Sequence, residues 1–113
     1  MPDATTPVAA LKDAIRRFAA ARGWDPYHTP KNLAMALASE VGEVCDLFRW
    51  LTPDESVAAA ADPKLREAIA DELADVANIV FLLSEHCGCD LSHGSAATGD
   101  MNAEMSRPRG GGT

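Results

Sequence analysis

Apolar residues recur at intervals of three and four along most of this 113-residue chain, which is the spacing of one face of an α-helix. The first such run carries its apolar residues on one face: Leu11, Ile15 and Phe18. Thr6 followed by Pro7 combines an N-cap residue with a proline at the first helical position, and Gly23 is a natural stop. The pattern predicts a first helix that begins at Pro7 and ends just before Gly23.

The same start signal, a cap residue followed by proline, occurs at Thr29 and again at Asp62. It predicts two long helices, 30–51 and 63–87, the second of which stops at a glycine. Between them, the sequence "TPDE" at 52–55 is a capping box that opens a short helix.

Two long helices joined by a short helical connection predict an antiparallel pair. The length corresponds to one domain, and a domain of this size often completes its core by oligomerisation. We therefore expect an all-α fold, a helical bundle with two long antiparallel helices that carry a carboxylate metal site, completed by oligomerisation. The domain should cover residues 1–91, followed by a weakly helical or disordered C-terminal tail over 92–113, where the apolar periodicity is weak.

Charge and cysteine content narrow the function classes. A net charge of −7 leaves no basic patch for nucleic acid or for an anionic membrane, but it is compatible with binding cations. No apolar stretch reaches the length of a membrane span. The three cysteines, in a chain without a recognisable signal peptide, predict reduced thiols and a cytoplasmic location.

The two long predicted helices repeat one pattern at an offset of 32 residues. "LAMALASEVGEVCDLFRWL" in the first aligns with "LREAIADELADVANIVFLL" in the second, apolar residue on apolar residue. The alignment also pairs acidic residues: Glu40 with Glu72, and Glu43 with Asp75. Because residues three apart are neighbours on a helix, each helix presents two adjacent carboxylates.

Glu40 and Glu72 lie near the centres of the apolar stripes of their helices. An antiparallel pair would bring all four carboxylates together, where they must hold either protons or cations. Oxygen ligands alone favour Mg²⁺, or Mn²⁺. The simpler alternative is that the glutamates reach solvent or pair with basic residues: Arg49, Lys64 or Arg66. A di-iron site is disfavoured, because such bundles carry histidine three residues after glutamate on two of their helices.

The motifs "EVGE" at residue 40 and "ELAD" at residue 72 resemble the E-x-x-E…E-x-x-D signature of the all-α nucleoside triphosphate pyrophosphohydrolases, the MazG-like group. The segment "FAAARGWDPYHTPKNLAMALASEVGEVCDLFRW" is most similar to the dCTP pyrophosphatase branch, and the resemblance extends from Phe18 to Leu91. It implies a helical bundle that forms a homodimer or homotetramer and cleaves nucleoside triphosphates between the α and β phosphates, as a house-cleaning enzyme. It also implies a set of Mg²⁺-binding catalytic carboxylates: Glu40, Glu43, Glu72 and Asp75.

The resemblance also implies substrate-binding residues. Trp24, His28 and Trp50 would line the base pocket, while Lys31 and Asn32 would reach the phosphates. In the C-terminal segment, where the family carries a basic phosphate-binding motif, only one matching residue is present, Asn102, and Thr98 stands where a lysine is expected.

This departure leaves two alternatives to a pyrophosphohydrolase. One is a metal- and nucleotide-binding bundle with little turnover. The other is a structural or partner-binding bundle, in which the carboxylates serve only to set the pairing of the helices.

Overall fold

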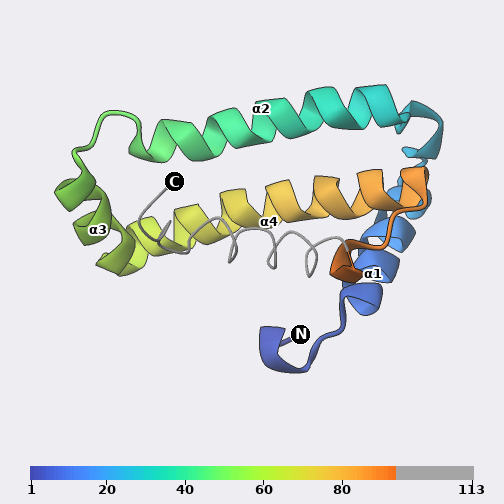
Figure 1. The fold of residues 1–113 in the computed structure, drawn as a ribbon, viewed down its shortest axis with the longest axis horizontal. Coiled ribbons are helices and arrows are strands. Elements are labelled where there is room, and N and C mark those ends of the chain that lie inside the picture. Colours follow the sequence, from blue (N-terminus) through green and yellow to red (C-terminus); the bar gives the residue numbers. More distant parts are fainter. Residues whose placement is uncertain (94–113) are drawn as a thin grey trace, which may run out of the picture.

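The computed structural model describes residues 1–93, which form four α-helices and two single-turn 3₁₀ helices (Figure 1). The α-helices are α1 (Val8–Ala21), α2 (Pro30–Phe48), α3 (Pro53–Ala61) and α4 (Pro63–Cys87), and the 3₁₀ helices are η1 (Asp3–Thr5) and η2 (Asp25–Tyr27). Every regular element among these residues is helical, which confirms the all-α prediction. Asn102, and residues 94–113 of the predicted tail, lie outside the described part.

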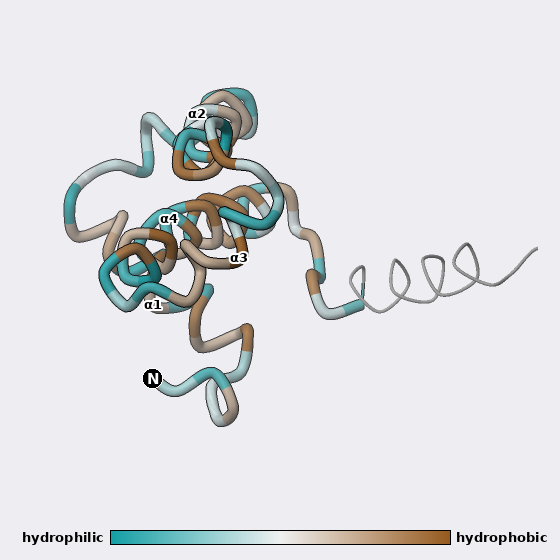
Figure 2. The backbone as a smooth tube through the Cα atoms, turned by 90° about the vertical axis from the view of Figure 1, so that its left-hand side faces the viewer, coloured by the Kyte–Doolittle hydropathy of each residue, from teal (hydrophilic) through white to brown (hydrophobic). Residues whose placement is uncertain are grey.

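The two long helices α2 and α4 run side by side in opposite directions, as their short connection predicts (Figure 1). Helix α1 packs against the C-terminal half of α4, and α3 closes the opposite end of the pair. In the end-on view of Figure 2, α4 lies between α2 and α1. The hairpin therefore has two different ends, one covered by α1 and one by α3.

The local start and stop signals act as expected at α2, α3 and α4. The Thr29 hydroxyl accepts a hydrogen bond from the Asn32 amide at 3.1 Å. The Thr52 and Glu55 side chains each accept from the other's backbone amide, which completes the capping box. At the end of α4, Gly88 adopts a left-handed conformation with φ of +66°.

Two predicted boundaries were wrong. Thr6 does not cap α1, because its hydroxyl donates instead to the Pro2 carbonyl, and the helix begins at Val8 with Pro7 as its cap residue. Helix α2 ends at Phe48, three residues before the predicted Leu51, since the chain turns over the next residues to reach the capping box.

The buried core lies where α1, α2 and α4 meet. Ala19, Leu33 and Leu82 are 0%, 2% and 6% exposed, and Ile15 and Ile79 pack against them. Leu82 faces away from the apolar stripe of α4 and is buried by α1. Among the described residues, no helix is long and apolar enough to cross a membrane.

Candidate functional site

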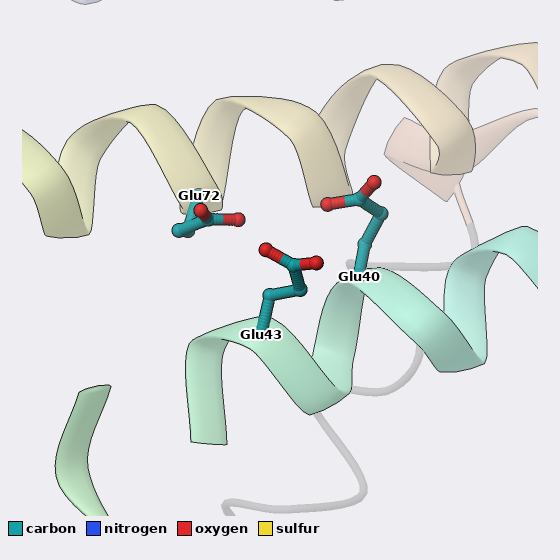
Figure 3. Close-up of side chains that lie close together, drawn as sticks. All are labelled: Glu40, Glu43 and Glu72. Carbon is teal, nitrogen blue, oxygen red and sulfur yellow. The ribbon is translucent and has the colours of Figure 1, made fainter. Parts of the chain in front are cut away.

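Three glutamates converge between the two long helices (Figure 3). Glu40 and Glu43 project from α2 and Glu72 from α4, and one carboxylate oxygen of each lies within 4.8 Å of the others. We call these three residues the carboxylate cluster. The geometry follows from the sequence, because the i, i+3 spacing places two carboxylates on one face of α2 and the antiparallel pairing sets α4 opposite them.

Asp75, one turn beyond Glu72 on α4, is exposed and lies beside the cluster. Burial raises the pKa of Glu40 first, followed by the negative charges of Asp75 and Glu43. Burial likewise raises the pKa of Glu72, with Glu43 as its strongest charged neighbour and Asp75 next. The predicted four-carboxylate set is thus close enough to interact electrostatically, with Asp75 facing Glu40 and Glu43 facing Glu72.

The alternative in which basic side chains neutralise these glutamates is contradicted at two of its three residues. Arg49 forms an ion pair with Asp46 at 3.0 Å, and Arg66 donates to the carbonyls of Ala60 and Ala61. Within residues 1–93, no ion pair involves Asp75 or the carboxylate cluster.

The carboxylate cluster fits a divalent cation. Glu72 Oε2 is buried and has no hydrogen-bond partner, and an unsatisfied buried carboxylate oxygen is costly unless a cation or a proton compensates it. The donors are all carboxylate oxygens, which hard cations such as Mg²⁺ and Mn²⁺ prefer. The sequence-based prediction of a carboxylate metal site is consistent with this geometry.

A groove of about 610 Å³ opens beside the cluster and extends toward α1. At one end it is bounded by Glu40 and Asp75. Its remaining lining is mostly apolar and aromatic: Ile15, Phe18, Trp24, Tyr27, His28, Asn32, Leu33, Ala36, Asn78, Ile79 and Leu82. A larger cavity of about 730 Å³, between the start of α1 and the end of α4, contains no member of the cluster and is remote from this chemistry.

The aromatic end of the groove is built by the turn between α1 and α2. Trp24 meets Phe18 edge-to-face, with ring centroids 5.5 Å apart, and lies 6.1 Å from the His28 ring. The Asn32 side chain donates to the Tyr27 carbonyl at 2.9 Å and so ties this turn to the start of α2. His28 Nδ1 is buried without a hydrogen-bond partner.

The structure thus brings three of the predicted substrate residues to one groove: Trp24, His28 and Asn32. It does not bring Lys31 or Trp50 there. Lys31 is exposed at the start of α2, and Trp50 is 83% exposed beyond the end of that helix, with the Arg49 guanidinium 5.1 Å from its ring centre.

Sequence reasoning missed other lining residues: Ile15, Phe18, Tyr27 and Asn78. The first two face the groove only because α1 crosses α4, which no local pattern reveals. For Asn78 a signal was available, since it is a polar residue inside an apolar run, three positions after Asp75.

No family profile matches the chain. Two curated relatives are named dCTP pyrophosphatase 1: that of Rattus norvegicus is 38% identical over 107 residues, and that of Homo sapiens is 39% identical over 101 residues. These alignments cover 91% and 86% of this chain. A solved structure, a pyrophosphatase from Archaeoglobus fulgidus, superposes with a TM-score of 0.76 at 29% identity, covering 87% of this chain and 90% of its own.

Over most of its length the chain is therefore similar to proteins named dCTP pyrophosphatase 1 and to a pyrophosphatase of known structure, in line with its resemblance to the MazG-like all-α NTP pyrophosphohydrolases. The two motifs on which the resemblance rests are the stretches of α2 and α4 that carry the cluster. The chain spans about 60% of the length of the curated relatives it matches, 62% of the rat protein and 59% of the human one.

Proposed function

We propose that this protein is a divalent-metal-dependent pyrophosphohydrolase that converts a nucleoside triphosphate to the monophosphate and pyrophosphate. The observation that carries the proposal is the convergence of three carboxylates beside an aromatic groove that one of them, Glu40, lines. The relatives named dCTP pyrophosphatase 1 support dCTP, or a similar or modified nucleotide, as the substrate, and hence a house-cleaning role.

The carboxylate cluster, with Asp75 beside it, would hold Mg²⁺, and Mn²⁺ could use the same ligands. When bound, such a cation neutralises phosphate charge and lowers the pKa of a coordinated water. Glu72 supplies the buried, unpartnered oxygen, and Glu40 the half-buried carboxylate facing the groove. Glu43 is the exposed member of the cluster, and we assign to it the orientation and deprotonation of the attacking water.

The groove fits the rest of a nucleotide. Its volume of about 610 Å³ is within the range of small-molecule sites. Phosphates would lie at the carboxylate end, and the base would lie between the aromatic walls around Trp24 and His28, because aromatic rings offer stacking faces. Asn32 would contact the substrate through the side-chain oxygen that its bond to Tyr27 leaves available. Lys31, Trp50 and Asn102 stay predicted substrate residues without a place in the described groove.

We also propose that a second copy of the chain covers exposed apolar residues of the two long helices. Val41 and Leu73, which the repeated pattern pairs, are 44% and 52% exposed. Burying such residues is a common reason for small helical domains to associate. Size-exclusion chromatography with light scattering should give the mass of a dimer or a tetramer. Leu73→Glu should shift that mass toward the monomer. A monomeric wild type would contradict this proposal.

The enzymatic proposal is tested by measuring pyrophosphate release from a panel of deoxynucleoside triphosphates with Mg²⁺. We expect release by the wild type, loss of release in Glu40→Gln, and wild-type activity in Glu67→Gln. Glu67 is exposed on α4, outside the cluster, so the control makes the same chemical change on the surface. Thermal unfolding of each variant, with and without Mg²⁺, shows whether it is folded.

The alternatives give different results. Metal-dependent nucleotide binding without pyrophosphate release would replace the enzyme by a binding protein. If neither Mg²⁺ nor any nucleotide raises the melting temperature, the site proposal fails and a structural or partner-binding bundle remains.

A further inference from the structure

Asn78 is a polar residue in the apolar part of the groove. It is half-buried on α4, six residues beyond Glu72, and lines the groove together with Asp75 and Ile79. The surrounding lining is hydrophobic, from Leu33 on α2 to Leu82 on α4. An amide in such surroundings has few partners within the protein and is available to a ligand.

The other polar side chains of the groove are less available. The Asn32 amide nitrogen already donates to the Tyr27 carbonyl, and His28 Nδ1 is buried away from solvent. The side chain of Asn78 forms no hydrogen bond with any other described residue. It can therefore offer both an N–H donor and a carbonyl acceptor to whatever occupies the groove.

The position along α4 also suits recognition of a base. Six residues of helix rise about 9 Å, so Asn78 lies about 9 Å along the axis from Glu72, toward the aromatic end. In a nucleotide, the base is separated from the α-phosphate by one sugar ring, a similar span. A nucleotide with its phosphates at the carboxylate cluster would thus place its base beside Asn78.

Stacking against Trp24 or Phe18 discriminates little between bases, because every base has an aromatic face. Hydrogen bonds to the base edge discriminate well, because a wrong base leaves buried polar groups unpaired. The substrate proposed above, dCTP or a similar nucleotide, presents a base edge in which a ring nitrogen accepts a hydrogen bond and an exocyclic amino group donates one, and a side-chain amide complements both.

We propose that Asn78 determines the base preference of the site by hydrogen bonding a base edge in which a ring nitrogen adjoins an exocyclic amino group, as in cytosine. The amide nitrogen donates to the ring nitrogen, and the amide oxygen accepts from the amino group. This inference rests on the proposed function, since it assumes that a nucleotide occupies the groove.

The test compares two variants at this position. Asn78→Leu has a similar size but no hydrogen-bonding group, and Asn78→Asp keeps an acceptor but loses the donor. We would measure kcat/KM for dCTP and dTTP, and the Kd of each nucleotide by calorimetry. Inorganic tripolyphosphate with Mg²⁺ serves as a base-free probe of the phosphate end.

We expect the wild type to prefer dCTP over dTTP and Asn78→Leu to reduce that preference at least tenfold, chiefly by losing dCTP. Asn78→Asp should weaken dCTP less than Asn78→Leu does and should disfavour dTTP. Tripolyphosphate binding should stay within about twofold of wild type in both variants, whereas a merely structural role would change it together with nucleotide binding.

An unchanged ratio of dCTP to dTTP in Asn78→Leu would overturn the inference, as would a wild type that prefers dTTP. These outcomes differ from failure of the proposed function, in which the wild type itself would release no pyrophosphate from any nucleotide.

Discussion

Leu33 and Leu65 are equivalent in the repeated pattern but differ in burial, and truncating each to alanine should therefore have different costs. Leu33 is 2% exposed in the core beneath α1, while Leu65 is 44% exposed at the α3 end. If burial within this fold determines the free energy of unfolding, Leu33→Ala must cost more than Leu65→Ala.

The magnitudes follow from the surroundings of each side chain. Truncation of a buried leucine to alanine costs about 2–5 kcal/mol, depending on how far the cavity is relieved. Because Leu33 also lines the groove, the space that it leaves joins an open, hydrated cavity, so we expect the lower part of this range, about 2–3 kcal/mol. The Leu65 side chain is only a little more than half buried, so Leu65→Ala should lower the free energy of unfolding by about 1–1.5 kcal/mol, roughly half of what full burial of a leucine contributes.

The assay is urea unfolding followed by far-ultraviolet circular dichroism, at one protein concentration and without metal. The midpoint for Leu33→Ala should fall by about 1–2 M relative to wild type, with an unchanged slope. If the two variants lose the same stability within about 0.5 kcal/mol, the reasoning is refuted, because Leu65 would then be as buried in solution as Leu33.

Three further predictions concern the site and the helix ends. Because the pKa values of Glu40 and Glu72 are raised above 4.5, the folded protein binds protons at these carboxylates more tightly than the unfolded chain does. The melting temperature in EDTA should therefore fall as the pH rises from 4.5 toward 7. A flat or rising profile, or an unchanged slope in Glu40→Gln, would contradict this. Trp24→Ala should weaken nucleotide binding about fivefold to 150-fold, because one stacking contact is lost, and should leave Mg²⁺ binding, measured by calorimetry, unchanged. An equal loss of nucleotide and Mg²⁺ binding would show that Trp24 supports the fold instead. Gly88→Ala should destabilise the protein by about 1–2 kcal/mol, because the φ of +66° at this position disfavours a side chain. Gly42→Ala inside α2, where an added Cβ meets nothing within 4 Å, should instead stabilise the protein by up to about 1 kcal/mol. Chemical denaturation of both variants checks the two signs.

Much of the fold followed from local rules in the sequence. Cap residues followed by proline predicted the starts of α2 and α4, and Gly88 predicted the end of α4. The two boundary errors have physical causes. The apolar spacing of α2 continues through Leu51, although the helix has already ended before Arg49. At the start of α1, the Thr6 hydroxyl donates to the Pro2 carbonyl in the preceding turn instead of capping the helix.

The carboxylate cluster was predictable from the sequence because its residues lie on two helices with the same spacing of acidic residues, and only the antiparallel pairing had to be assumed. The groove was less accessible. Its aromatic end depends on α1 crossing α4 and on the turn that positions Trp24, and these are tertiary contacts without periodicity. Trp50 was grouped with this end because a motif contained it, but the end of α2 directs it into solvent.

The repeated pattern in α2 and α4 has a consequence for the side from which a ligand would reach the carboxylate cluster. An antiparallel pair with equivalent residues has an approximate two-fold axis, and this axis exchanges the Glu40–Asp75 pair with the Glu72–Glu43 pair. The carboxylates alone would serve a substrate approaching from either side. The flanking helices remove this equivalence: the α1 side has the groove of about 610 Å³, and the α3 side has an apolar pocket of only about 140 Å³. The carboxylates thus have a large groove on one side only, and under the proposed function a nucleotide would bind with its base toward α1.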